Sequence, residues 1–171
     1  MLNIKEKQTI GTLAELYNAD YYTWAMTNAE LLKEGRVNEI DYINLAEEVK
    51  DLGLSEYKEL RSYLANLLSH LYKWDNQPDL RTKSWINTIA NSINEITQTL
   101  KRNPGLKYKP VFDEAFSDGW NKAKYIIFSD TEIKFNLIPD DSPYSFKEAV
   151  RKASEITEIK NQDIFFLNNL F

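Results

Sequence analysis

Two helical stripes separated by a short break constrain the fold of this chain most strongly. Residues 57–74 and residues 86–100 both carry apolar side chains three or four positions apart, which is the spacing of one helix face. Between them, Pro78 disfavours helical backbone in the residue before it. Helices joined by so short a break fold back on each other, so the sequence predicts an antiparallel helical hairpin. The stripes consist of Tyr57, Leu60, Leu64, Leu67, Leu68, Leu71 and Trp74, and of Ile86, Ile89, Ile93, Ile96 and Leu100.

Capping patterns and helix-breaking residues predict further helices on both sides of this hairpin. Thr12 and Ser145 each precede a glutamate by three residues, which is the capping box at a helix start. Glycine after an apolar stripe is typical of a helix end. The expected starts are Thr12, Asn38 or Asp41, Ser55, the stretch from Pro78 to Ser84, Pro110 and Ser145, and the expected ends include Gly35, Leu52 before Gly53, and Asn103-Pro104-Gly105.

The remaining segments carry weaker patterns. Residues 1–11 are expected to be a loose lead-in. Residues 133–137 alternate apolar and polar, but a lone strand has no pairing partner, so we expect extended chain packed on the bundle. The apolar tail, residues 157–171, is expected either to dock on the bundle or to meet another subunit.

The predicted fold is all-α, an antiparallel helical bundle of about six helices with an extended C-terminal segment. We expect one domain over residues 1–171, with its bundle core in residues 12–156.

Composition excludes several classes of protein. No apolar run approaches the length of a membrane span, which needs about 20 residues. The N-terminus lacks the apolar core of a signal peptide, and cysteine is absent, so we expect a cytoplasmic protein without disulfides. The net charge of −5 conceals a basic middle third, residues 61–110, between two acidic thirds. Charge complementarity within the molecule explains this pattern, and the spread of basic residues does not favour nucleic-acid binding.

A set of residues with distinctive spacing runs from the first helix to the turn after the fifth. They are Tyr17-x-x-Asp20-x-Tyr22-x-Trp24, Leu31-Leu32, Gly35-Arg36, Leu45-x-Glu47-Glu48-Val49, Leu52-Gly53, Leu68-x-His70-Leu71-x-Lys73-Trp74, Pro78, Ser84-Trp85, Thr88-Ile89, Asn103-Pro104-Gly105-Leu106 and Pro143-Tyr144. With these motifs the sequence resembles a bacterial family, common in cyanobacteria, known as domain of unknown function 29. The resemblance implies a small, soluble, all-helical domain without an assigned reaction.

The chain departs from that family in its fourth helix. Where the family is usually rich in arginine, this sequence has Ile86 and Ile93, and Asn103 and Gly105 replace two serines of the family's Ser-Pro-Ser-Leu break. A basic binding face on this helix is therefore not expected here.

His70, the only histidine, is the first candidate for chemistry. It falls on the flank of its helical stripe, where the preceding helix could bring Asp41 or Glu48 close. Together with Glu47, these groups could hold a metal ion or support proton transfer. The paired Glu-x-x-His motif of di-metal bundles is missing, however. We therefore expect no metal and no cofactor, and we favour a hydrogen bond that pins the two helices together.

Trp74 and Trp85 flank the break of the hairpin, beside Lys73 and Arg81. Core packing at a helix corner is the first interpretation, and exposed aromatic rings with basic neighbours would instead form a recognition surface. No nucleophile or phosphate-binding motif is present. We expect the protein to act through contact with an unknown protein partner or with further copies of itself. The alternative is an enzyme or metal-binding protein with a site built from His70 and the carboxylates of the second helix.

Overall fold

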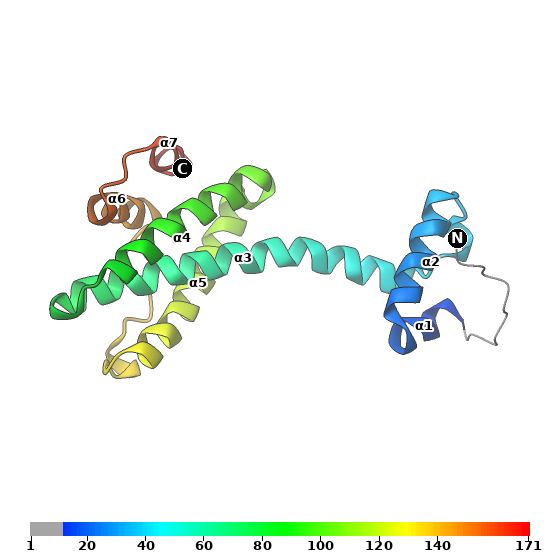
Figure 1. Ribbon diagram of the computed structural model, residues 1–171, viewed down its shortest axis with the longest axis horizontal. Coiled ribbons are helices and arrows are strands. Elements are labelled where there is room, and N and C mark those ends of the chain that lie inside the picture. The colour runs from blue at the N-terminus through cyan, green and yellow to red at the C-terminus, as the bar shows by residue number, and fades with distance from the viewer. Residues whose placement is uncertain (1–11) are drawn as a thin grey trace. The chain divides into compact units, whose positions relative to one another are not determined.

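The computed structural model describes residues 12–171, and the predicted lead-in, residues 1–11, lies outside the described residues. Within residues 12–171 the chain is all-α, as predicted, and contains no strand (Figure 1). Two compact units are present, one that ends at Leu54 and one from Ser55 to Phe171. Whether they form a single domain stays a prediction. The elements are α1 (Leu13–Ala19), α2 (Tyr21–Lys33), η1 (Val37–Glu39), α3 (Tyr42–Asn76), η2 (Pro78–Leu80), α4 (Lys83–Arg102), η3 (Pro104–Lys107), α5 (Lys109–Asp130), η4 (Phe135–Leu137), α6 (Phe146–Thr157) and α7 (Gln162–Asn168), where η marks a 3-10 helix.

The first unit begins with two helices where the sequence predicts one. The expected helix from Thr12 to Gly35 is divided at Asp20, whose backbone leaves the helical region at φ −153° and ψ 80°. Its carboxylate accepts a hydrogen bond from the backbone N–H of Thr23 at 3.1 Å, so Asp20 caps α2. The predicted end is correct, because Gly35 adopts a positive φ of 72°, which suits glycine.

Helix α3 is longer than predicted. The expected end at Leu52 and the expected new start at Ser55 are wrong, because α3 runs without interruption from Tyr42 to Asn76. Gly53 does not adopt the positive φ that ends a helix. An isolated glycine weakens a helix by about 1 kcal/mol but does not have to end it when both sides are strongly helical. Residues 42–54 of α3 belong to the first unit, and residues 55–76 belong to the second.

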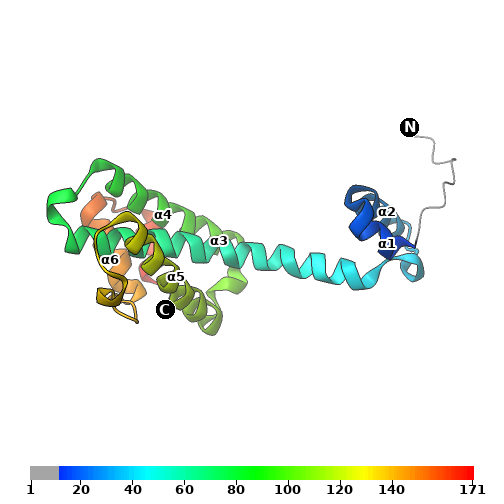
Figure 2. The same cartoon turned by 90° about the horizontal axis from the view of Figure 1, so that it is seen from below.

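The second unit is built on the predicted hairpin. From Ser55 onward α3 lies beside α4 in both views, and the chain reverses direction at η2 between them (Figures 1 and 2). Pro78 begins η2, and the side chain of Thr82 caps α4. Helix α4 ends at Arg102, directly before the predicted break. The hairpin prediction is therefore confirmed, including its break and its end.

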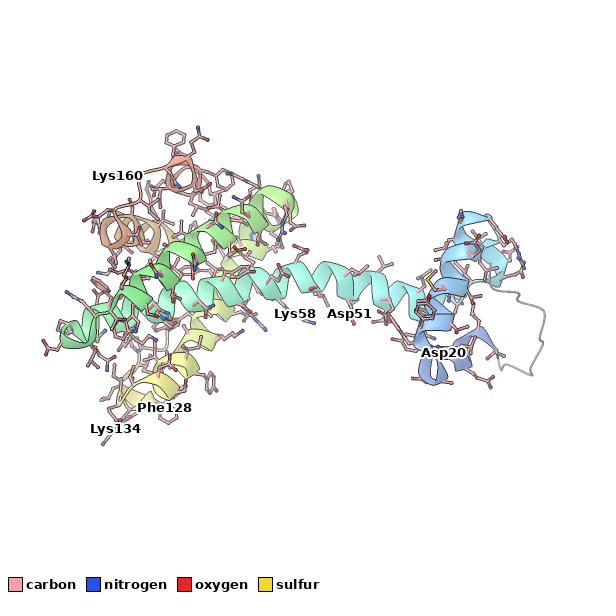
Figure 3. All side chains as sticks on the ribbon, in the orientation of Figure 1. Asp20, Asp51, Lys58, Phe128, Lys134 and Lys160 are labelled. Atoms are coloured by element: carbon pink, nitrogen blue, oxygen red, sulfur yellow. The ribbon has the colours of Figure 1, made fainter. Side chains whose placement is uncertain are left out.

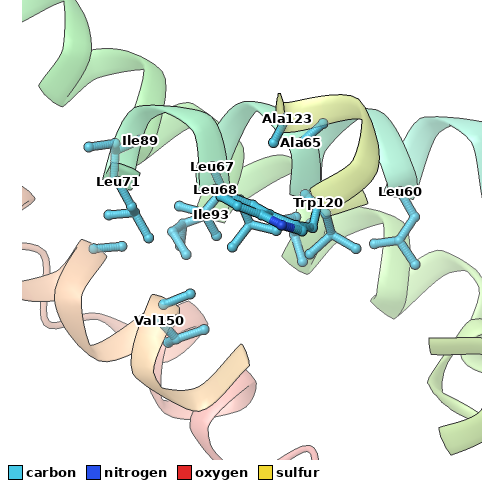
Figure 4. Close-up of a cluster of buried hydrophobic side chains, with 14 of the residues drawn as sticks. Leu60, Ala65, Leu67, Leu68, Leu71, Ile89, Ile93, Trp120, Ala123 and Val150 are labelled. Atoms are coloured by element: carbon cyan, nitrogen blue, oxygen red, sulfur yellow. The ribbon is translucent and has the colours of Figure 1, made fainter. Parts of the chain in front are cut away.

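Apolar side chains of the hairpin form the core with α5, α6 and α7. The predicted stripe of α3 is fully buried at its five leucines, and Trp120 of α5 packs among the same side chains (Figure 4). The indole N–H of Trp120 donates to the backbone carbonyl of Pro139 at 3.1 Å, which satisfies the buried donor. The core residues include Leu60, Leu64, Leu67, Leu68, Leu71, Ile89, Ile93, Ile96, Leu100, Phe112, Trp120, Ile127 and Val150.

The C-terminal part of the chain closes this core. Helix α6 begins with the predicted capping box at Ser145 and Glu148. The tail forms the short helix α7, which the sequence did not predict, and Ile164 and Leu167 join the core. The tail therefore docks on the bundle, which is one of the two alternatives that the sequence left open. None of the helices in residues 12–171 is both long enough and apolar enough to cross a membrane.

Candidate functional site

The imidazole of His70 is held by its own helix. Its Nδ1 atom lies 2.9 Å from the backbone carbonyl oxygen of Asn66, one turn earlier in α3, and 3.3 Å from the hydroxyl of Ser69. A carbonyl only accepts hydrogen bonds, so Nδ1 carries the proton. The Nε2 atom then accepts, and the ammonium of Lys73 lies 3.5 Å from it. The partners of His70 therefore fix one neutral tautomer.

Lys73 connects His70 to α5 and α4. Its side chain is almost completely buried, with 4% exposed, and its ammonium donates to Asp130 of α5 at 2.9 Å. The same ammonium lies 5.4 Å from the ring centre of Trp85 in α4, and the rings of His70 and Trp85 meet edge to face. These four side chains form the Lys73 cluster, in which the buried cation has both an ion-pair partner and an aromatic neighbour.

Burial and the neighbouring ammonium of Lys73 favour the neutral form of His70. Burial lowers the pKa of His70 below its ordinary value, and the positive charge of Lys73 lowers it further, against the opposing effects of Asn66 and Asp130. The hydrogen bond from Lys73 lowers the pKa of Asp130. Asp130 stands 57 residues after Lys73 in the sequence, and no local pattern indicates that pairing.

Trp74 and Arg81 meet at the corner of the hairpin. The guanidinium of Arg81 lies 4.8 Å from the ring centre of Trp74, and its Nε donates to the backbone carbonyl of Trp74 at 2.9 Å. The four predicted binding residues thus form two pairs, Trp74 with Arg81 and Trp85 with Lys73. Beside this corner, Asp75 accepts from the hydroxyl of Tyr144 at 2.6 Å and pairs with Lys152 at 2.7 Å.

In the first unit, Glu48 binds two tyrosines. Its carboxylate accepts from the hydroxyls of Tyr17 in α1 and Tyr21 in α2, both at 2.7 Å. These bonds lower the pKa of Glu48, and the bond to Glu48 is the main reason that the pKa of Tyr17 rises to about 12. From the sequence, Glu48 is a candidate partner of His70, and the two tyrosines are not identified. Tyr17 and Tyr21 are four residues apart, so they share one helix face, and this spacing is the sequence signal that could have identified them as a pair.

Asp41 binds the indole of Trp24. Its carboxylate accepts from the indole N–H at 3.0 Å and from the side-chain amide of Asn44 at 2.6 Å, while its backbone N–H donates to Asn28 at 2.9 Å. Burial raises the pKa of Asp41, but the hydrogen bonds from Asn44 and Trp24 outweigh it and leave the pKa below its usual value. Asp41 therefore joins the start of α3 to α2.

The predicted pairing of these carboxylates with His70 depended on a turn at Gly53 that α3 does not make. Asp41 and Glu48 find their partners in the first unit, and His70 finds its partners in the second. Glu47 pairs with Lys50, one turn along α3, at 3.5 Å. Among residues 12–171, histidine and carboxylate groups do not gather in any set of three or more that could hold a metal ion.

An exposed apolar strip, which we call the α3 face, lies on the part of α3 in the first unit. Tyr42, Val49 and Leu52 have exposed fractions of 70%, 60% and 71%. At about 100° per residue they fall on one side of the helix, with Ala46 at the edge next to Tyr42. Such spacing is typical of a buried helix face, but within the described residues only Leu45, which falls between Val49 and Leu52 around the helix, is partly covered.

Comparisons with known proteins identify a family but assign no reaction. No curated protein and no solved structure matches this chain. One family model does match, over residues 16–153, and it is described as a domain of unknown function, DUF29. This match covers most of the chain, from α1 to α6. The chain therefore belongs to the DUF29 family.

Proposed function

We propose that this protein acts through protein–protein contact, and that the α3 face binds a basic amphipathic helix of a partner protein. The observation that carries the proposal is the exposure of Tyr42, Val49 and Leu52 on one side of a regular helix. A helix that presents apolar side chains at this spacing offers the contact surface used in helix–helix recognition. Contiguous exposed apolar surface of this kind is typical of interaction sites.

The balance of buried and exposed side chains in the first unit supports the proposal that this unit binds a partner protein. In residues 12–54, only Trp24, Asn28 and Leu31 are buried. Ten of the 18 large apolar side chains that are exposed in the described residues lie in this same short segment. A unit of this size buries little apolar surface by itself, so a partner helix on the α3 face would add what its own core lacks.

Charge favours a basic partner over a second copy of the chain. Residues 12–54 contain nine acidic and three basic side chains, a net charge of −6. Asp51 projects from α3 (Figure 3), and within residues 12–171 its carboxylate forms no ion pair. Two copies that met through this unit would bring like charges together, whereas lysine or arginine on a partner helix would be attracted.

The enzyme alternative has less support. Both ring nitrogens of His70 have partners, and His70 lines neither the cavity at the start of α5 nor the one beside Trp120. A general acid–base residue has to reach a substrate through an open pocket. We propose a cytoplasmic location as well, which is supported by the absence of cysteine from the sequence.

A synthetic peptide tests the partner chemistry directly. The probe is a fluorescein-labelled helical peptide of about 18 residues, five turns, with leucine on one face and lysine on the other. We expect saturable binding to the full chain by fluorescence anisotropy, and weaker binding at high salt. Leu52→Asp should weaken binding at least about tenfold. Leu137→Asp is the matched control, because Leu137 is 65% exposed in the second unit, and it should leave binding unchanged.

Two further measurements can overturn the proposal. A peptide with glutamate in place of lysine should bind at least about tenfold more weakly, and equal binding would refute the charge argument. Light scattering of the purified chain should give the mass of a monomer. A dimer that Leu52→Asp dissociates would instead make a second copy the occupant of the α3 face.

A further inference from the structure

The second unit contains a cavity of about 310 Å³ that no part of the proposed function uses. Four of its lining residues, Lys109, Phe112, Asp113 and Phe116, lie on one face of α5, as their spacing of three and four requires. The start of α6 and the end of α7 form the other walls. Its volume is at the lower end of the range for small-molecule sites.

Aromatic rings form most of its apolar wall. Phe112, which is 1% exposed, lies at the back, with ring centres 4.8 Å from both Phe146 and Phe171. Phe116 faces Phe146 with ring centres 6.1 Å apart. Leu167 of α7 is buried beside them. A planar apolar ring could therefore meet both faces and edges of phenylalanine, as aromatic pairs prefer.

The charged side chains that line the cavity are two lysines and one aspartate. Lys109 donates to both oxygens of Asp113 at 2.9 Å, and its ammonium lies 5.4 Å from the ring centre of Phe171. Both partners of this pair are more than half exposed, so water weakens their attraction. Lys147 lines the cavity as well, and within residues 12–171 its ammonium makes no ion pair or hydrogen bond.

From this arrangement we propose that the cavity binds a small organic anion, with an aromatic ring against the phenylalanines and a carboxylate at Lys147. The carboxylate would give Lys147 the acceptor that it lacks, and Lys109 stands close enough to the same rim to add a second positive charge. A ligand with an ammonium in that position would meet the side chains of two lysines and of one acidic residue, Asp113. Charge at the rim thus selects the anion, and the rings select its apolar part.

Three probes that differ only in their polar group test this proposal. They are 4-phenylbutyrate, 4-phenylbutan-1-ol and 4-phenylbutylamine, each added to the ¹⁵N-labelled full chain. Amide chemical shifts in NMR spectra report both the affinity and the place of binding. We expect 4-phenylbutyrate to bind most tightly and the amine most weakly, with the largest shifts at residues 112–116, 145–147 and 167–171.

Two variants separate the contributions of charge and ring. Lys147→Gln should weaken binding of 4-phenylbutyrate about fivefold and leave the alcohol unchanged, because only the carboxylate uses that charge. Phe146→Leu should weaken all three probes. Lys160→Gln is the matched control, because Lys160 is exposed in the segment between α6 and α7 and does not line the cavity (Figure 3). It should change none of the affinities.

Each other outcome counts against the proposal. Absence of saturable shifts with any probe would show that the cavity does not bind such molecules. Binding of the amine as tight as that of 4-phenylbutyrate would refute the role of Lys147. Equal effects of Lys147→Gln and Lys160→Gln would mean that the net charge of the surface, and not this site, attracts the anion. A thermal unfolding curve for each variant verifies that it is folded.

Discussion

His70 shows how neighbours decide the charge of a side chain. Its Nδ1–H donates to a backbone carbonyl, and its Nε2 faces the buried ammonium of Lys73. A second proton would place two positive charges about 3.5 Å apart, partly removed from water. The carboxylate of Asp130 balances only one of them, because it already pairs with Lys73. The neutral imidazole is therefore part of the folded state.

This leads to a pH dependence of stability. The pKa of His70 is lower in the fold than its ordinary value of 6.5, so the unfolded chain binds the proton more tightly. The free energy of unfolding should therefore fall as the pH drops through about 6.5 toward the lower pKa of the folded state, and this contribution should stay level below it. Urea unfolding between about pH 7.5 and pH 5.5 measures the effect.

His70→Asn is the control for this measurement. The asparagine amide can still donate to the carbonyl of Asn66, but it does not titrate, so the slope between these pH values should become flatter. The carboxyls with lowered pKa, among them Asp41, Glu48 and Asp130, lose their contribution only at lower pH. An identical slope in both proteins would contradict the assignment to His70.

Among the elements, α3 is the one whose extent the sequence leaves open. Gly53 is an acceptable residue in a helix and also a good end to one, and its neighbours do not decide between them. In the structure, a Cβ atom added at Gly53 would meet no atom within 4 Å. At Gly35 the space is equally open, but φ is +72°. The two glycines therefore have different roles, one inside a helix and one after it.

Alanine substitutions at these glycines test the continuity of α3. Gly53→Ala should stabilise the protein by about 0.5–1 kcal/mol, because alanine is the better residue inside a helix. Gly35→Ala should destabilise it by about 1 kcal/mol, because alanine is strained at a positive φ. Thermal unfolding followed by circular dichroism measures both changes. A lower unfolding midpoint for Gly53→Ala, like the one expected for Gly35→Ala, would mean that α3 does not continue through Gly53.

The elements also show how far the sequence predicts this fold. The α4 stripe, its start after Pro78 and the capping box at Ser145 follow from local patterns, which the structure confirms. The break at Asp20 was missed because the apolar spacing continues across it, and only the cap to Thr23 reveals it. The Lys73 pairing with Asp130, like the binding of Glu48 to Tyr17 and Tyr21, joins residues from different helices. The spacing of Tyr17 and Tyr21 indicates that the two share a helix face, but which carboxylate they meet depends on how the helices pack.

At the scale of the whole molecule, the two units differ in the number of side chains that each one buries. Residues 55–171 contain nearly all of the fully buried side chains, from Leu60 to Leu167. In residues 12–54, the contacts consist mainly of aromatic rings and the hydrogen bonds of Asp41 and Glu48. Local stability follows the amount of buried apolar contact, so the units should open with different free energies.

Hydrogen exchange measures this difference. Amides in residues 64–72 and 89–100 should be the most protected, while those of α1 and α2 should exchange at least about tenfold faster. The peptide proposed for the α3 face should slow exchange in the first unit alone, because it binds only there. Uniform protection across residues 12–171 would show that the chain opens as a single cooperative body.

The bond from Trp24 to Asp41 provides a built-in spectroscopic label. The sequence has four tryptophans, at positions 24, 74, 85 and 120, and only the first lies in the unit that ends at Leu54. In protein labelled with 5-fluorotryptophan, one of four ¹⁹F signals would thus report on that unit. Because its indole N–H donates to a carboxylate at 3.0 Å, this signal should move when Asp41 takes up a proton. A single residue therefore makes events in one unit visible without any added dye.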